Sequence, residues 1–412
     1  MEQNGISKLD LKRRNRMQII KLLQQQGPTS RIDLSALLEL TRAAVTIITN
    51  EMIEQGVLYE KGEVSTVGQK ASRGRKKILI DINRNYKFAF GIALDHKKIF
   101  IGLSNIGGEV LEKRVYELRA NDTKESMMQQ IFINMREMMT NNCLTEQQIL
   151  GAGICLNRRA IRFLNLKVEQ NVVDYSSLER MFVREFHMPV VFDSIITGLA
   201  AAEIDFSGKY PPDKSAVVIR FADNVDATLV VDNEIYRGYH NNAMNLGHMI
   251  VNPDGKPCRC GKRGCAVCEF SDESVYVDIV NMFSKEKTPN LFAAKNGNPN
   301  LLRVAEVNEY VLLGDEGVEE LFDQMLKSFV LFLNNLIAIT DPQRIIFCGH
   351  LFENEEFMKR LKEYVARELG SEIADMVAAS YLSQEHIYLS GCALAIRRFF
   401  VERGGFGTKA EE

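Results

Sequence analysis

The chain has 412 residues, of which 46% are hydrophobic and 25% charged, and its formal net charge is −3 at pH 7. This composition is typical of a globular protein, and the length suffices for two or three domains with cores of their own. No run approaches the roughly 18 consecutive apolar residues of a membrane-spanning helix, and the first residues lack the apolar segment of a signal peptide. Eight scattered cysteines do not make a disulfide framework, so we expect a cytoplasmic protein.

Positive charge is concentrated at the N-terminus. Residues 1–80 contain 14 Lys and Arg against 8 Asp and Glu, whereas the remaining residues contain 37 against 46. A basic segment attached to an acidic body is typical of a protein in which only that segment binds a polyanion.

Two short helices are predicted at the start of the basic segment. The first begins near Leu11 and ends at Gly27-Pro28, and the second follows Ser30, whose side chain would cap it together with Asp33. The apolar positions expected to face the core are Met17, Ile20 and Leu23 in the first helix and Ile32, Leu34, Leu37 and Leu38 in the second.

A third helix, capped by Thr41, would point Val45, Ile48 and Met52 inward. Its outward residues would be Arg42, Ala43, Thr46, Ile47 and Asn50. The short turn between the second and third helices indicates a helix-turn-helix whose third helix enters a major groove of DNA. The alternative is a helical hairpin that packs on the next domain.

Residues 57–62 and 76–82 have strand character and predict a hairpin, or wing. Its tip carries Arg73-Gly74-Arg75, two guanidinium groups around a slim backbone, which suit a narrow A·T-rich minor groove. Lys76 and Lys77 would contact phosphates. A charged run is often only a solvated loop, but a place beside a recognition helix favours DNA binding.

Beyond residue 83, strands and helices alternate and the order repeats. Predicted strands at 88–95, 98–105 and 109–118 precede a helix at 127–140 and a strand at 149–156. The second set has strands at 216–221, 227–233 and 234–238, a helix at 322–340 and a strand at 344–349. The repeat predicts two α/β lobes with a ligand cleft between them.

The second lobe contains the motif GH-x9-C-x-C-G-x2-G-C, from Gly247 to Cys265. With this motif, the helix-turn-helix and the two lobes, the chain resembles the ROK family (repressors, open reading frames and kinases), and most closely its branch of xylose, glucose and N-acetylglucosamine repressors. The resemblance implies a winged helix-turn-helix domain followed by an actin-like, ribonuclease-H-like α/β body. The implied domains are 1–82, a first lobe 83–197 completed by a C-terminal helix 388–405, and a second lobe 198–387.

The resemblance also implies that one structural Zn²⁺ is bound by His248, Cys258, Cys260 and Cys265. Thiolates and imidazole suit zinc, and four protein ligands leave no coordination position for a substrate. Cys268, in the same loop 247–268, is a further thiol that could replace one ligand. The alternative is a reduced surface loop with chance cysteines.

The residues that phosphorylate sugars in the family's kinases are replaced. Where the kinases have a Gly-Gly-Thr phosphate turn, this chain has ALDHKKIFIG, and the position of the catalytic Asp falls on Ile195. Asp193 would restore a carboxylate only in a shifted alignment. FADNVDA and Gly349-His350 stand in the other nucleotide-binding turns. Because isoleucine cannot accept a proton, we predict no catalytic residue and no enzyme activity.

The sugar pocket of the family is altered as well. Its two hydroxyl-binding glutamates fall on Asn245 and Val267, and its Asn-Asp pair falls on Ser194-Ile195. Valine and isoleucine make no hydrogen bonds, so an ordinary hexose is a poor ligand. The candidate ligand-binding residues for an altered effector are Ser194, His240, Asn241 and Asn245.

The sequence therefore predicts a DNA-binding transcriptional regulator, a repressor of carbohydrate-related genes. We expect a homodimer whose two heads bind an A·T-rich inverted repeat in double-stranded DNA, with a sugar or sugar derivative as effector. Two alternatives stay open: a sugar kinase with a fused DNA-binding head, and a regulator released from DNA by a protein partner.

Overall fold

The computed structural model describes residues 8–63, 77–95, 98–119, 121–169, 172–208, 214–222, 224–239 and 243–406. The chain divides into two compact units. The first comprises Met1–Glu169, Val173–Pro212 and Ile387–Glu412, and the second comprises Gln170–Val172 and Asp213–His386. Each unit contains one five-stranded sheet among its described residues.

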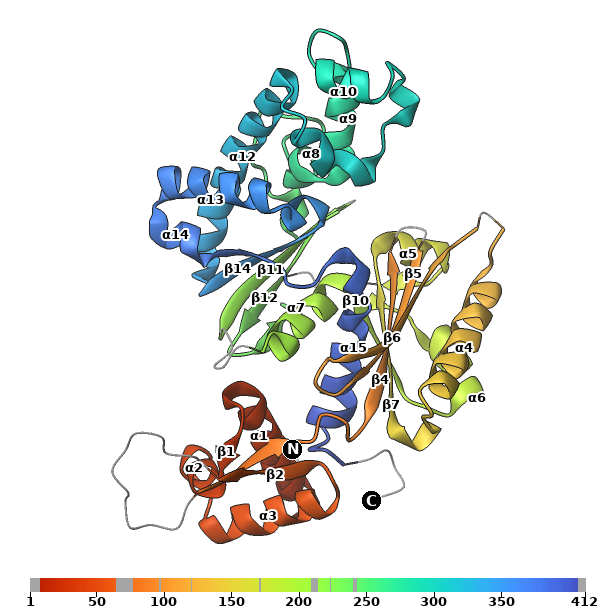
Figure 1. The fold of residues 1–412 in the computed structure, drawn as a ribbon, viewed down its shortest axis with the longest axis vertical. Coiled ribbons are helices and arrows are strands. Elements are labelled where there is room, and N and C mark those ends of the chain that lie inside the picture. Colours follow the sequence, from red (N-terminus) through yellow and green to blue (C-terminus); the bar gives the residue numbers. More distant parts are fainter. Residues whose placement is uncertain are drawn as a thin grey trace. The chain divides into compact units, whose positions relative to one another are not determined.

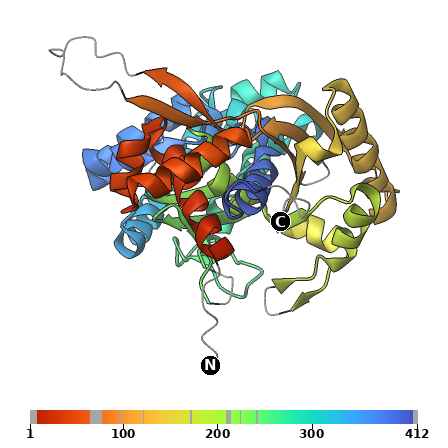
Figure 2. The same cartoon turned by 90° about the horizontal axis from the view of Figure 1, so that it is seen from below.

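The first unit begins with three helices and a small antiparallel sheet. The helices are α1 (Lys8–Gln26), α2 (Arg31–Leu37) and α3 (Arg42–Glu54), and the strands, in sheet order, are β1 (Thr29–Ser30), β3 (Ile78–Ile82) and β2 (Leu58–Glu63). Strands β2 and β3 run side by side away from the helices (Figure 2). The three helices and the hairpin expected from the sequence are confirmed.

Local capping explains where α2 and α3 begin. The side chains of Ser30 and Thr41 accept hydrogen bonds from the backbone N–H groups of Asp33 and Ala44. Each bond satisfies one of the donors that a helix start leaves unpaired. Since only three residues separate the end of α2 from Thr41, the two helices are held in a tight turn.

The predicted buried face of α2 is wrong at two positions. Leu34 is fully buried, but Ile32 and Leu37 are 46% and 50% exposed. Residues of an α-helix are about 100° apart around the axis, so Ile32 faces nearly opposite to Leu34. A helix of seven residues has too few turns to bury both sides.

The first large sheet has the order β10-β7-β4-β5-β6. Its strands are β4 (Phe88–Asp95), β5 (Lys98–Asn105), β6 (Val110–Glu117), β7 (Ile149–Leu156) and β10 (Val190–Ser194). Strands β4, β5 and β6 form an antiparallel meander, whereas β7 and β10 are added in parallel on the other side of β4. The predicted meander is confirmed.

Helices cover both faces of this sheet. They are α4 (Lys124–Asn141), α5 (Arg158–Phe163), α6 (Ser176–Phe186), α7 (Ile195–Phe206) and α15 (Leu389–Ile396), with a short pair of strands, β8 (Val168–Glu169) and β9 (Val172–Val173), after α5. Helices α4 and α6 lie on one face and α7 and α15 on the other (Figure 1). The α4 side is a core of aliphatic and aromatic side chains.

On the opposite face, α15 lies so close to β4 and β7 that their backbones are in contact at glycine positions. A Cβ atom at Gly391 would stand 2.3 Å from the carbonyl oxygen of Gly153, and one at Gly153 would stand 2.0 Å from that of Gly391. A Cβ at Gly91 would be 2.0 Å from the carbonyl oxygen of Tyr388. Only glycine permits this approach.

The second unit repeats the topology, with the sheet order β13-β12-β11-β14-β15. Its strands are β11 (Ser215–Phe221), β12 (Val225–Val231), β13 (Glu234–Tyr236), β14 (Arg344–Cys348) and β15 (Val377–Ala379). Here too a meander of three antiparallel strands is extended by two parallel strands beside its first member. The repeat expected from the sequence is thereby confirmed.

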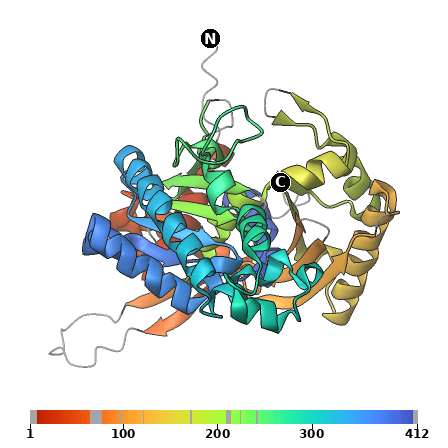
Figure 3. The same cartoon turned by 90° about the horizontal axis from the view of Figure 1, so that it is seen from above.

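The helices of the second unit are α8 (Ala266–Phe270), α9 (Asp272–Met282), α10 (Pro289–Ala294), α11 (Val307–Val311), α12 (Glu316–Thr340), α13 (Glu355–Leu369) and α14 (Ser371–Met376). Helices α12 and α13 lie side by side (Figure 3). Within the described ranges, α12 is the one helix long and apolar enough to cross a membrane. Its buried residues, including Phe322, Phe329 and Phe332, belong to the core cluster that also holds β11 and β14, so α12 is a core helix.

The contact between α15 and the sheet predicts the effect of a single methyl group. Gly391→Ala improves intrinsic helix propensity by about 1 kcal/mol, yet it places Cβ against the backbone of β4 and β7. We expect a loss of unfolding free energy of about 1–3 kcal/mol, the usual cost of overpacking, measured by denaturant titration. A variant with a higher unfolding free energy would show that the gain in helix propensity outweighs the clash, and that α15 does not pack tightly on β4 and β7.

Candidate functional site

The candidate metal centre stands on a tightly turned loop between β13 and α8. Backbone bonds run from Val251 N to Gly264 O and from Cys258 N to Lys262 O, each 2.8 Å long. Gly264 has a φ of +64°, and a Cβ there would lie 1.4 Å from the carbonyl oxygen of Asn252. Glycine is therefore required at this position for the loop to fold back on itself.

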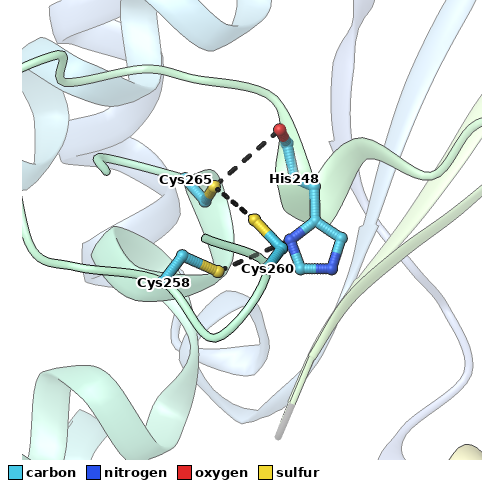
Figure 4. Close-up of side chains that lie close together, drawn as sticks. All are labelled: His248, Cys258, Cys260 and Cys265. Atoms are coloured by element: carbon cyan, nitrogen blue, oxygen red, sulfur yellow. Dashed lines mark hydrogen bonds between the residues drawn. The ribbon is translucent and has the colours of Figure 1, made fainter. Parts of the chain in front are cut away.

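Four side chains of this loop converge (Figure 4). They are His248, Cys258, Cys260 and Cys265, whose nitrogen and sulfur atoms all lie within 4.8 Å of one another. Cys258 Sγ is 3.6 Å from His248 Nδ1, and Cys260 Sγ is 3.6 Å from Cys265 Sγ. These four residues were predicted to bind one ion. The folded loop brings them into one cluster that could hold a metal ion.

Cys268 is outside this cluster, as defined among the described residues. It lies on α8, where its Sγ donates to the carbonyl oxygen of Pro257 over 3.8 Å. Cys258 and Cys265 are buried, whereas Cys260 is exposed. This fourth thiol therefore borders the cluster and is not one of its members.

The outward face of α3 carries the five residues of this helix that were predicted to face DNA. Arg42, Ala43, Thr46, Ile47 and Asn50 are exposed, whereas Val45, Ile48 and Met52 on the other side are buried as expected. Ile47 is 67% exposed. Its aliphatic side chain stands among polar neighbours on this face.

Arg31, at the start of α2, was not singled out from the sequence, yet it braces this face. Its guanidinium donates to Thr49 Oγ1 at 3.1 Å, to Asn50 Oδ1 at 2.8 Å and to Glu60 Oε1 at 2.9 Å. These bonds link α2, α3 and β2. Because a guanidinium has only donors, it fixes the carbonyl oxygen of Asn50 toward itself and leaves the amide NH₂ turned away.

Of the predicted wing residues, only Lys77 lies within the described part of the chain. Its ammonium group is 2.8 Å from Asp33 Oδ1. Hydrogen bonds from Lys77 and Ser30 hold the pKa of Asp33 below its usual value. Arg73, Gly74, Arg75 and Lys76 lie outside the described residues.

The predicted effector residues are distributed over both units. Ser194 caps α7 in the first unit, and its Oγ is 2.7 Å from Thr197 Oγ1. Asn245 precedes a short 3₁₀ turn, Leu246–His248, in the second unit. His240 and Asn241 lie outside the described residues.

A polar pair at the carboxyl ends of β4 and β7 was not identified from the sequence. Asn157 Nδ2 donates to Asp95 Oδ1 at 2.9 Å, and both side chains are buried. Asp193 is the penultimate residue of the neighbouring strand β10. The polar residues at these strand ends could have been noticed in the sequence, because ligands of open α/β sheets bind at the carboxyl ends of parallel strands.

Ile195 occupies the first position of α7 and is 2% exposed. Asp193, two residues earlier, accepts a hydrogen bond from the backbone N–H of Ser194 at 2.7 Å. The side chain at the expected base position is therefore apolar and packed.

Comparison with known proteins identifies the body of the chain. A model of the ROK family matches residues 89–395. The xylose repressor of Caldicellulosiruptor bescii is 24% identical over 363 residues, which cover 86% of this chain and 88% of that protein.

Solved structures share the fold. A ROK family transcriptional regulator, a homologue of the Escherichia coli Mlc protein, superposes with a TM-score of 0.72 at 21% identity over 96% of this chain and 97% of that one. A ROK hexokinase from Thermus thermophilus has a TM-score of 0.56 at 20% identity, over 75% of this chain and 98% of that one. Since the family model spans most of the chain and both large sheets, the chain belongs to the ROK family.

Proposed function

We propose that this protein is a DNA-binding transcriptional regulator of carbohydrate genes. The observation that carries the proposal is α3, the second of two helices joined by a tight turn, whose exposed face is made of residues suited to base edges. The hairpin of β2 and β3 follows it as a wing. A regulator with the name xylose repressor is among the similar proteins.

In this proposal the residues of α3 divide the recognition of DNA. Arg42, at the N-terminus of the helix, would donate to guanine, and Ile47 would cover a thymine methyl group. Asn50, whose carbonyl oxygen is bound by Arg31, would present its NH₂ donor to a base acceptor. Thr46 Oγ1 bonds the carbonyl oxygen of Arg42 and supports the helix start. Ala43 would allow close approach.

The wing would add contacts outside the major groove. Arg73 and Arg75, around Gly74, would enter an A·T-rich minor groove, and Lys76 would contact a phosphate. Lys77 would exchange its ion pair with Asp33 for a phosphate oxygen. The exchange costs little, because exposed ion pairs contribute at most about 1 kcal/mol.

We further propose the division into a winged head (1–82), a first lobe (83–197 with 388–405) and a second lobe (198–387), and a cytoplasmic homodimer. Two heads related by a twofold axis would bind the two halves of an inverted repeat. A sugar or sugar derivative would act on the body, with Ser194 and Asn245, together with His240 and Asn241, as its candidate contacts.

For the metal, we propose structural zinc. Four ligands around a tetrahedral Zn²⁺, with Zn–S near 2.3 Å and Zn–N near 2.0 Å, stand about 3.5 to 3.8 Å apart. The two ligand-atom distances of 3.6 Å in the cluster match this spacing. His248, Cys258, Cys260 and Cys265 would fill the coordination shell, so the ion would brace the loop and take no part in chemistry.

We also propose that the body does not transfer phosphate. A general base must accept the proton of the attacking hydroxyl, and Ile195 has no group that can do so. The family includes sugar kinases, and the related hexokinase structure keeps a kinase as the alternative. A regulator released by a protein partner is the second alternative, since the sugar contacts expected of the family are replaced here at Val267 and Ile195.

Removal of one thiol tests the metal centre. We expect Cys258→Ser protein to lose its zinc and to unfold at a lower temperature, because a structural zinc site contributes to folding energy directly. Elemental analysis and thermal denaturation measure both effects. Cys268→Ser is the matched control and should retain about one zinc per chain. Loss of metal from the control alone would assign Cys268 as the true ligand.

Substitutions on α3 test the DNA-binding function. We expect Ile47→Ala and Arg42→Ala each to weaken specific binding by about 1–3 kcal/mol without changing the affinity for random DNA beyond the loss of one charge. Fluorescence anisotropy at fixed salt, on DNA from upstream of the gene, gives the affinities. Leu37→Ala, which removes an exposed leucine from α2, is the control. Equal affinities for all three proteins would rule out α3 as the recognition helix.

The same assay identifies the signal. Sugars, amino sugars, sugar acids and sugar phosphates are added to the protein–DNA complex one at a time. Release by one of them shows that the body is a small-molecule sensor, because a ligand can shift an equilibrium only by its differential affinity for the two states. Binding that none of them changes directs the search to protein partners.

A kinase assay tests the proposed absence of catalysis. We expect no phosphorylation of the sugars of this panel in the presence of Mg²⁺ and ATP above the rate of a protein-free control. Sugar-dependent turnover that Asp193→Asn abolishes would establish the kinase alternative and make Asp193 its base.

A further inference from the structure

The end of the described chain is bound to the DNA-binding head. After α15, a π-helical turn (Arg397–Val401) leads into the C-terminal turn, defined here as residues 402–406. This turn lies beside α1 (Figure 2), and the Nε atom of Arg16 donates to the carbonyl oxygen of Gly404 at 2.7 Å. Arg16 and Gly404 are 388 residues apart in the sequence.

The C-terminal turn is shaped for this contact by glycine. Gly404 and Gly405 have φ angles of +66° and +72°. A Cβ atom at Gly404 would lie 2.8 Å from the carbonyl oxygen of Arg13 and 2.9 Å from Arg16 Cβ. The backbone of the turn therefore rests directly on α1, at a position where any other residue is both strained and obstructed.

Arg16 is the centre of the contact. Its side chain is fully buried, and its guanidinium carbon is 3.9 Å from the centroid of the Phe406 ring. Arg16 Nη1 lies 3.6 Å from Glu51 Oε1, on α3, and Lys12 Nζ is 2.6 Å from the same oxygen. A single cation thus joins α1, α3 and the C-terminal turn.

An arginine is an unusual residue for a buried packing position. Taking a guanidinium out of water costs several kcal/mol unless carboxylates, carbonyls or aromatic faces replace the lost hydration. An apolar residue would fill the same space without that cost. The bond from Nε to the carbonyl oxygen of Gly404 and the stacking on Phe406, in contrast, fix the guanidinium in direction, so the side chain determines orientation as well as packing.

We propose that Arg16 is a positioning residue for DNA binding, which holds α3 in a fixed direction relative to the first large sheet. The inference rests on the proposed function. Arg16 is buried and does not touch DNA. It acts through Glu51 on α3 and through the C-terminal turn, which is continuous with α15 and hence with the glycine contact on β4 and β7. We call the contact of Arg16 with Glu51 and with the C-terminal turn the clamp. In the proposed dimer, the clamp sets the distance between the two recognition helices.

The test compares one half-site with a complete inverted repeat whose central spacing is varied. Arg16→Met and Gly404→Ala remove the clamp from its two sides. Gly208→Ala is the matched control, because Gly208 has a similar φ of +68° in the same unit but nothing within 4 Å of its Cβ.

For both clamp variants we expect an unchanged affinity for the half-site. We also expect a loss of about tenfold or more on the optimally spaced repeat and a broader tolerance of spacing, because simultaneous binding of both heads depends on their geometry. The double variant should be no worse than either single variant. An equal loss on half-site and repeat would show that Arg16 only keeps the head folded, and unchanged binding of the repeat would refute the positioning role.

Hydrogen exchange separates failure of this inference from failure of the proposed function. In Arg16→Met protein without DNA, amides of α1 and of residues 402–406 should exchange faster than in the wild type, whereas those of β4 and β7 should not change. Unchanged exchange in the C-terminal turn would refute the clamp even if the wild-type protein binds DNA. Wild-type protein that binds no DNA would refute the proposed function and, with it, the positioning role.

Discussion

The approach of α15 to the first large sheet is the constraint on which the first unit depends. At Gly91, Gly153 and Gly391 no Cβ separates the backbones of helix and strands, so the helix has one depth and one register on the strands. Backbone contacts of this kind are not adaptable, because no rotamer can absorb a displacement. Whatever is attached to α15 is therefore held in a fixed place, and the C-terminal turn that contacts α1 is attached to it.

The loop that carries the candidate metal centre is held in shape in a different way. Between β13 and α8 the chain has isolated bridges, Ile250 to Cys265 and Pro257 to Arg263, in place of a continuous ladder. Backbone hydrogen bonds such as Gly264 N to Lys256 O and Ala266 N to Met249 O hold the loop in turns, and its glycines add conformational entropy in the unfolded state. The proposed zinc ion would add to these bonds, because a filled coordination shell would fix His248, Cys258, Cys260 and Cys265 at once.

Much of the fold could be predicted from local sequence signals, whereas contacts between residues far apart in the sequence could not. Caps at Ser30 and Thr41 and the alternation of strands and helices are properties of neighbouring residues, and the motif shared with the ROK family contains the four residues of the candidate metal cluster. The bond from Arg16 to Gly404 and the pair of Asp95 with Asn157 join residues far apart in sequence. Such pairs depend on how strands and helices are packed, which no local pattern contains. The predicted burial of Ile32 is wrong, because apolar character alone does not decide which face of a short helix is buried.

Polar groups on the exposed surface of the head already have partners within the chain. On the head, Arg31 binds Asn50 and Lys77 binds Asp33. In the proposed complex, DNA would displace or share these bonds, and exchanging one hydrogen bond for another yields little net free energy per contact. Sequence-specific affinity then depends on making many contacts together, which requires each recognition helix to arrive in the correct direction. A buried arginine that fixes this direction contributes to affinity without touching DNA, because it removes the orientational cost before binding takes place.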